Sequence, residues 1–220
     1  MKVELIAYTP NPADVVELAA SVCYDSKPTK SHAIAKSCLK SGHLSVWEHV
    51  SFTFHVSEVS RALLAQLTRH RHLSFSVRSQ RYCREDGFQY VNPFIDGTEL
   101  RECFDSAMSI DASTYNVLIK NGAAPEDARA VLPNACHTEL FVTANARALI
   151  EASRLRLCVR AQKEIRNLFK AMKELVEPVC PEVAAAMVPT CETHDIPYCG
   201  EHHNGCGRYP KLKDLIKEKA

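Results

Sequence analysis

The sequence predicts an α+β fold in which helices pack around a small, mainly antiparallel sheet to form a single catalytic domain. Three observations lead to this prediction. Apolar residues at helical spacing dominate the 220-residue chain, strand-like segments are few, and they do not alternate with helices as a parallel sheet requires. With 46% hydrophobic and 24% charged residues, the chain has the composition of a globular protein that buries a core.

The first expected elements are a strand and two helices. Residues 2–8 (KVELIAY) are expected to form a short strand. Residues 11–25 begin with an Asn/Asp capping region and then space their apolar side chains as a helix does. Residues 32–42 predict a second helix, which ends at Gly42 because glycine readily adopts the backbone conformation that follows a helix.

A strand, a helix and a loop are expected next. Residues 50–56 (VSFTFHV) alternate apolar and polar side chains, which is typical of a strand with one buried face. Residues 60–71 predict a helix that carries the sequence Arg-His-Arg at its C-terminal end. Residues 74–82 lack helical spacing and are expected to form an extended loop.

The second half of the chain is expected to be mostly helical. Residues 98–122 predict a long helix, and residues 124–133 predict another, with a proline in its first turn and one at its end. Residues 138–145 are expected to form a strand. Asn145 then caps residues 146–178, which predict one long helix or two in series.

A change of composition divides the chain into a main domain, residues 1–180, and a Cys/His-rich C-terminal tail, residues 181–220. Cysteine and histidine pairs in the tail have spacings that suit tetrahedral zinc. The candidate ligands are Cys191, His194, Cys199 and Cys206, with His202 and His203 between the last two. A metal-free loop of the same composition is the alternative.

Composition also argues against several functions. The net charge of +1 disfavours a broad nucleic-acid-binding face, although a local basic pocket fits within it. The chain has no apolar run near the roughly 18 residues that a membrane span needs, and its start lacks a signal-peptide pattern. Most of the ten cysteines are isolated in the sequence. We therefore expect reduced thiols in a cytoplasmic protein with no membrane or nucleic-acid partner.

One segment, RHRHLSFSVRSQRY at residues 69–82, concentrates positive charge. It contains four arginines, two histidines and three serines, and no acidic residue. Arginine side chains match phosphate oxygens in pairs, and serine hydroxyls add neutral donors. A phosphate-bearing small ligand therefore explains the segment better than solvent exposure. Nucleic acid is the rival ligand, but it would call for a wider basic surface.

The same segment resembles the signature of the flavin-dependent thymidylate synthases. Its matching residues are Arg69-His70-Arg71, then Ser79 after seven residues, then Arg81-Tyr82. Further segments resemble the family in the same order. They are GHLSVWEH, FTFHV, ARAVLPNAC, TANAR and RLCVRAQKEIR, and the similarity spans about residues 20–170.

The resemblance implies reductive methylation of dUMP to dTMP. Methylenetetrahydrofolate would supply the carbon and NADPH the reducing equivalents, with FAD between them. It also implies a homotetramer whose active sites are shared between subunits. Two other functions stay open: a flavin- or nucleotide-binding homologue without synthase activity, and a zinc-containing nucleic-acid-binding module.

Carried over to this sequence, the family's site residues fall into three groups. The positions that match dUMP contacts are Gln66, Leu67, Thr68, Arg69, Val77, Arg78, Ser79, Gln80, Arg81, Arg129 and Arg156. The positions that match FAD contacts are Ser45, Arg69, His70, Arg71, Val77, Asn145, Ala146, Arg147 and Glu151. His43 and Tyr82 match positions near the flavin and folate.

Arg156 and Ser79 are the expected catalytic residues. Uracil C5 is a poor nucleophile, and hydride delivery to C6 by a reduced flavin takes the place of cysteine addition. Charge then develops along the N3/O4 edge, where Arg156 would stabilise it in the transition state. Ser79 is expected to bind and polarise the substrate, because no base lies at an obvious spacing beside it.

Four positions depart from the family pattern. Ser76 replaces a frequent Asn, Val77 an acidic or amide residue, Glu151 an Asn or His, and Lys163 a Trp. A carboxylate at 151 is expected to pair with Arg147, four residues earlier, instead of contacting flavin. We expect these changes to weaken FAD affinity without changing the reaction.

Overall fold

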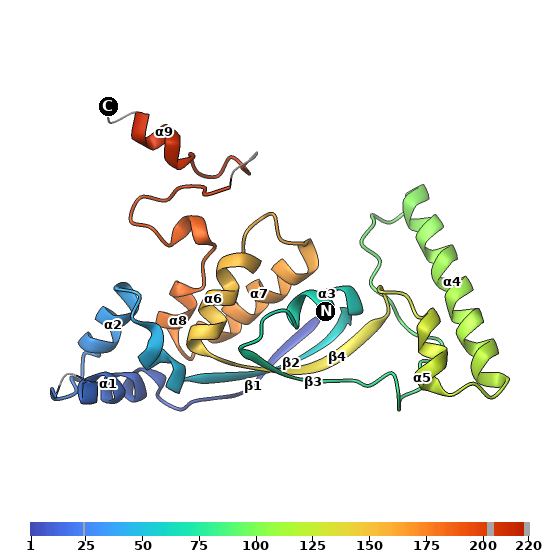
Figure 1. Cartoon of the computed structure of the whole chain (residues 1–220), viewed down its shortest axis with the longest axis horizontal. Helices are drawn as coiled ribbons and strands as arrows, with labels where there is room; N and C mark the ends of the chain where they lie inside the picture. The colour runs from blue at the N-terminus through green and yellow to red at the C-terminus, as the bar shows by residue number, and fades with distance from the viewer. Residues whose placement is uncertain (24, 202–204, 218–220) are drawn as a thin grey trace. The chain divides into compact units, whose positions relative to one another are not determined.

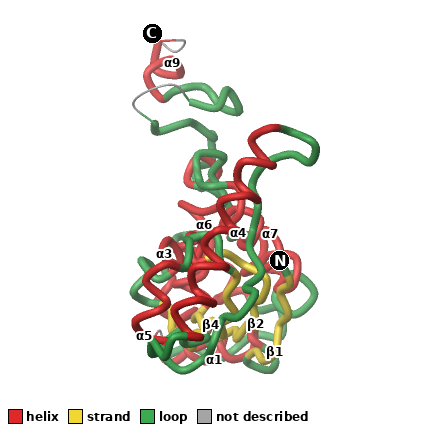
Figure 2. Tube along the Cα trace, turned by 90° about the vertical axis from the view of Figure 1, so that its right-hand side faces the viewer, coloured by secondary structure: helices red, strands yellow, loops and turns green. Residues whose placement is uncertain are grey.

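The predicted fold class is confirmed. The computed structural model describes residues 1–23, 25–201 and 205–217, and it contains helices packed with a four-stranded antiparallel sheet (Figure 1). The strand order in the sheet is β1-β2-β4-β3. The strands are β1 (Lys2–Tyr8), β2 (Ser51–Ser60), β3 (Leu73–Val77) and β4 (His137–Asn145), shown in yellow where they are visible in Figure 2.

The chain forms two compact units, and every strand contributes residues to both. The first unit comprises Met1–Val3, His55–Arg71 and Phe75–Val142. The second comprises Glu4–Phe54, His72–Ser74 and Thr143–Ala220. The boundary expected at residue 180 stays a prediction. No helix in the described part of the chain is long and apolar enough to cross a membrane.

The first unit holds the long predicted helix. Its helices are α3 (Arg61–Leu67), α4 (Glu99–Lys120), α5 (Pro125–Ala128) and the 3-10 turn η2 (Arg129–Val131). α4 lies beside α5, and buried Phe88, Met108 and Cys136 form a cluster against which Tyr90 and Phe104 pack (Figure 1). α4 ends, as predicted, before Gly122, whose φ of +89° favours a residue without a Cβ.

The second unit holds most of the remaining helices. They are α1 (Pro12–Cys23), α2 (Ala33–Lys40), α6 (Ala146–Arg156), α7 (Lys163–Val176), α8 (Pro181–Ala186), α9 (Leu212–Lys217), and the 3-10 turns η1 (Leu44–His49) and η3 (Thr190–Glu192). Residues 146–178 therefore form two helices in series. α6, α7 and α8 pack against one another around buried Ile165, Leu168 and Phe169 (Figure 1).

Two expectations need correction. Residues 74–82 do not form only an extended loop, because Leu73–Val77 are the edge strand β3. Leu73 is buried, Phe75 and Val77 are half-buried, and the serines between them are exposed, which is the alternation of a strand that the prediction overlooked. The helix expected over residues 124–133 is also shorter: only Pro125–Ala128 are α-helical, and a 3-10 turn follows.

Glu17 is the buried acid that ties α1 to the start of α2. Its side chain is 1% exposed. It accepts hydrogen bonds from the Thr29 hydroxyl at 2.6 Å, the Thr29 amide at 3.0 Å and the Ala35 amide at 2.8 Å. Burial alone would raise the pKa of Glu17, but the bonds from Thr29 and Ala35 hold it below its usual value of 4.5.

We predict that Glu17→Gln destabilises the fold by about 1–3 kcal/mol at pH 7, because an amide cannot accept all of these bonds. Since the pKa of Glu17 is lower when folded than when unfolded, its contribution is present above the unfolded pKa. That contribution is lost as the pH falls through the folded value, so the difference from wild type should shrink in acid. Urea unfolding at several pH values measures this effect.

The matched control is Glu174→Gln, at an exposed position on α7 in the same unit. It should leave the free energy of unfolding nearly unchanged. A destabilisation by Glu17→Gln that stays constant from pH 7 into acid would contradict a role for the carboxylate charge.

Candidate active site

The Arg-His-Arg sequence lies in the turn that follows α3. The helix ends at Leu67, and the His70 amide donates to the Leu67 carbonyl oxygen at 3.1 Å. Arg69 and Arg71 are exposed, and among the described residues neither has an ion-pair partner. Two guanidinium groups on one turn are therefore available to phosphate oxygens.

Arg81 and Arg129, both matched to dUMP contacts, meet at Glu126 on α5. The Arg81 Nε lies 3.0 Å from the Glu126 carboxylate, and the Arg129 Nε donates to the Glu126 carbonyl oxygen at 3.2 Å. Ser79 lies at the same place, since its hydroxyl accepts from the Arg81 amide at 3.3 Å. The predicted residues thus form a real cluster in the first unit. The sequence reasoning missed Glu126, which organises it.

Arg78 and Tyr82 have different surroundings within that unit. The Arg78 Nε donates to Glu85 at 3.1 Å, and this hydrogen bond raises the pKa of Arg78. Tyr82 is 79% exposed, with the Arg81 guanidinium 5.4 Å from its ring centre. Residues 69–82 contain no acid, so the carboxylates that pair with Arg78 and Arg81 come from Glu85 and Glu126. The ring of Tyr82 faces solvent.

Several matched dUMP positions are buried or make hydrogen bonds within the protein. The Leu67 side chain is fully buried, so a ligand would reach only its backbone. The Gln80 amide is buried and lies 3.8 Å from the Cys136 sulfur. Gln66 and Thr68 donate to carbonyl oxygens of α3, at 3.4 and 3.0 Å. Val77 is half-buried. These side chains hold the backbone that presents Arg69 and Arg81.

In the second unit, Arg147 lies between two carboxylates. It donates from Nε to Glu151 at 2.9 Å and from Nη1 to Glu48 at 2.7 Å. The hydrogen bond to Glu151, followed by that to Glu48, raises the pKa of Arg147. The predicted Arg147–Glu151 pair is confirmed, whereas Glu48, which lies 99 residues from Arg147, was missed.

This ion pair lies at a small cavity of about 200 Å³. The Asn145 side chain is also in its wall and accepts from the Ala148 amide at 2.8 Å, as the expected helix cap. His72, another residue that the sequence reasoning missed, completes one side. Among the other matched positions, Ala146 is buried. Ser45 lies in η1 and His43 lies directly before it, and both are exposed.

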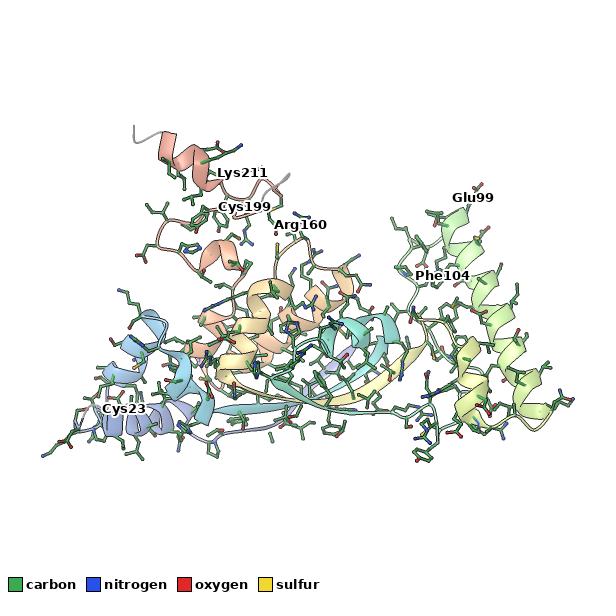
Figure 3. All side chains as sticks on the ribbon, in the orientation of Figure 1. Cys23, Glu99, Phe104, Arg160, Cys199 and Lys211 are labelled. Atoms are coloured by element: carbon green, nitrogen blue, oxygen red, sulfur yellow. The ribbon has the colours of Figure 1, made fainter. Side chains whose placement is uncertain are left out.

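Arg156 lies at the C-terminal end of α6, in the wall of a larger cavity of about 490 Å³. It is half-buried, and burial lowers its pKa. The opposite wall comes from the tail, at Pro189–Cys191, Cys199–Glu201, Cys206 and Tyr209. The loop after α6 is joined to this tail by an ion pair between Arg160 and Glu201 at 2.5 Å; Figure 3 labels Arg160 on that loop and Cys199 on the tail.

The cysteines form no metal site among the described residues. All ten are free, and burial raises the pKa of both Cys136 and Cys180 to about 11. Cys158, Cys191, Cys199 and Cys206 line the Arg156 cavity. Among the described residues, however, no three His, Cys, Asp or Glu side chains are placed to hold a metal ion, and His202 and His203 lie outside them. The zinc prediction is therefore unsupported, and His194 instead stacks on Tyr198.

Comparisons with known proteins identify the family of the chain. The family model described as "Thymidylate synthase complementing protein" matches residues 4–182. The flavin-dependent thymidylate synthase of Geobacter sulfurreducens is 42% identical over 234 aligned positions, covering 100% of both chains. That of Clostridium tetani is 38% identical, covering 98% of this chain and 96% of its own length.

A solved structure supports the fold. The crystal structure of the flavin-dependent thymidylate synthase of Helicobacter pylori, complexed with FAD and dUMP, superimposes with a TM-score of 0.71. It covers 86% of this chain and 100% of its own, at 23% identity, and so shows a shared fold. Together with the full-length sequence matches, these findings establish that the chain belongs to the flavin-dependent thymidylate synthase family.

Proposed function

We propose that this enzyme converts dUMP to dTMP by reductive methylation, with methylenetetrahydrofolate as carbon donor and NADPH as reductant through bound FAD. Family membership over the whole chain supports the reaction class. The observation that carries the proposal is the half-buried Arg156 guanidinium in the wall of a ligand-sized cavity. This is the group that the chemistry needs at the uracil ring.

Arg156 stabilises negative charge on the uracil ring as it develops. Removing part of its water shell strengthens the interaction of a fixed guanidinium with a nearby anion. The lowered pKa of Arg156 reflects that partial burial, and the group still stays protonated at neutral pH. Its effect is larger in the transition state than in the ground state, so it accelerates the reaction.

Ser79 binds the substrate in this proposal. Its hydroxyl accepts from the Arg81 amide, and Arg81 and Arg129 converge beside it on Glu126. A hydroxyl among arginines suits a phosphate or a ring carbonyl. Ser79 therefore has a binding role, since a serine that attacks the substrate would need a base to take its proton.

The residues of the chain fit FAD in the chemistry of their donors. Exposed Arg69 and Arg71 can hold a pyrophosphate, and Asn145 and Arg147 lie at the N-terminal end of α6, where anions are favoured. FAD supplies hydride chemistry when bound. The Helicobacter pylori relative, solved with FAD and dUMP, supports the same ligands here. Glu48 and Glu151 partly oppose FAD binding, because their ion pairs with Arg147 compete with the phosphates of the cofactor.

The proposal includes a homotetramer with shared active sites and a cytoplasmic location, as the family resemblance implies. Exposed Tyr82 supports sharing, as do Arg69 and Arg71, which have no ion-pair partner within the described part of the chain. A ligand or a second subunit can supply partners for these groups. The zinc-dependent nucleic-acid-binding alternative is not favoured, since its metal site has no support among the described residues.

The first test is tritium release from dUMP labelled at C5, with NADPH, methylenetetrahydrofolate and FAD. We expect release that depends on FAD, and about a 10²–10³-fold lower rate in Arg156→Ala, as on losing one donor to a developing charge. Arg101→Ala is the control. This arginine pairs with Asp96 and Asp105 on and near α4 and matches no ligand contact, so its loss should leave the rate unchanged.

Absence of release from folded, FAD-loaded wild type would exclude the synthase. The chain would then be the flavin- or nucleotide-binding homologue.

A second test concerns the carboxylates around Arg147. We predict that Glu151→Asn tightens FAD binding severalfold, because Arg147 loses a competing carboxylate and is freed for phosphate oxygens. Quenching of flavin fluorescence on titration measures the Kd. Glu174→Asn, at an exposed position on α7, should not change it. Weaker or unchanged FAD binding in Glu151→Asn would show that Glu151 does not compete with the cofactor.

A further inference from the structure

One face of the long helix α4 is apolar although it is exposed. Leu100, Ile110 and Val117 are 63%, 66% and 58% exposed. Cys103 and Ala107 lie on the same face and are exposed as well. Single exposed apolar side chains are ordinary, but several that gather on one surface indicate a contact with another molecule.

The residues of this face recur in alternating steps of three and four. The set, named the α4 stripe, is Leu100, Cys103, Ala107, Ile110, Thr114 and Val117. Such steps are the heptad pattern by which one helix packs along another. The stripe runs over most of the 22 residues of α4, a helix about 33 Å long. A second helix of similar length therefore fits it.

A different face of α4 is already packed within the chain. Met108 and Tyr115 are buried, and Phe104 and Ala112 are partly buried against the cluster that includes Phe88. The helix also contacts α5 and η2. These contacts fix α4 in place, so a rigid helix rather than a loop presents the α4 stripe.

The two ends of α4 carry opposite charges. Glu99 and Glu102 lie in the first turn and Lys120 lies in the last, and all three are exposed; Figure 3 labels Glu99 at the start of the helix. An antiparallel copy of α4 would place each acidic first turn beside a basic last turn, and it would also bring opposite ends of the helix dipoles together. A parallel copy would instead place like charges side by side, which is unfavourable.

We propose that the α4 stripe is an interface between two copies of this chain, in which two α4 helices pack antiparallel about a two-fold axis. The same surface then serves both copies. Three pairs follow from this register, each formed twice: Leu100 with the partner's Val117, Cys103 with the partner's Thr114, and Ala107 with the partner's Ile110. The contact assigns one surface of the proposed homotetramer and does not depend on the reaction.

A helix of an unrelated protein is the other occupant that an apolar stripe could accept. The second copy is favoured because the two ends of α4 complement each other in charge. It is also favoured because the stripe pairs with itself in a single register, with the small Ala107 opposite the large Ile110 at the centre. A different protein would have to match both features independently.

The test of the register is a disulfide between copies of the full-length Thr114→Cys variant, formed with the thiol oxidant diamide. We expect mass spectrometry to find the peptides that contain residues 103 and 114 joined by a disulfide. These residues lie about 16 Å apart along one helix, beyond the reach of a disulfide, so the link must join two chains. Asn116→Cys, exposed on α4 but outside the stripe, is the matched control and should not link to Cys103.

The test of the contact itself is Ile110→Asp, which places a charge on each copy at the centre of the apolar interface. We expect the molecular mass in solution, measured by light scattering, to fall to half of the wild-type value. Ile110 is exposed within its own chain, so the far-ultraviolet circular dichroism should stay unchanged, which separates dissociation from unfolding. Ser109→Asp, on the neighbouring exposed position outside the stripe, is the charge-matched control and should keep the wild-type mass.

Three results would each overturn the proposal: a monomeric wild type, an Ile110→Asp variant with the wild-type mass, or no link between residues 103 and 114. A disulfide between two copies of Cys103 in the wild type would show parallel helices and would overturn it as well. These measurements do not depend on turnover. Absence of tritium release would refute the proposed reaction, whereas a missing link in an active enzyme would refute only this interface.

Discussion

The pairing of arginine guanidinium groups with anions organises the candidate site. Protein carboxylates meet it at Arg78, Arg81, Arg147 and Arg160. Among the described residues, Arg69 and Arg71 lack such a partner. The chain thus divides its arginines into two groups: some are paired with its own carboxylates, and others are left for ligands that carry phosphate or carboxylate.

The positions of these arginines depend on two similar junctions between a strand and a helix. β2 leads directly into α3, where the Ser60 hydroxyl accepts from the Leu63 amide at 3.0 Å. β4 leads into α6, where Asn145 does the same for the Ala148 amide at 2.8 Å. Each cap fixes the direction of a helix that begins in the sheet. Arg69 and Arg71 follow the end of one helix, and Arg147 and Arg156 lie on the other, so rigid elements present them.

The surroundings of the cysteines agree with a chemistry in which the cofactor, rather than a thiol, activates the uracil. The buried thiols of Cys136 and Cys180 have raised pKa values, so at neutral pH they are protonated and unreactive. An arginine placed where charge develops needs no proton transfer and no covalent bond to the protein. The protein's part in such a reaction is to bind, orient and stabilise charge.

Local sequence patterns were sufficient for most of the elements and for contacts within one or two helical turns. The strand at residues 50–56, the helix ends at Gly42 and Gly122, the Asn145 cap and the Arg147–Glu151 pair all depend on neighbours a few residues apart. The family resemblance, which also rests on short motifs, identified arginines that lie in clusters in the structure.

Only the tertiary structure decided which groups surround those arginines. Glu126 lies 45 residues from Arg81, and Glu48 lies 99 residues from Arg147, so no local spacing could reveal either pair. The edge strand β3 alternates apolar and polar residues, but the pairing with β4 that makes it part of the sheet is non-local. The tail wall of the Arg156 cavity likewise arises from segments far apart in the chain. Sequence patterns encode neighbours along the backbone, whereas charge balance and cavities arise only when distant segments meet in the folded chain.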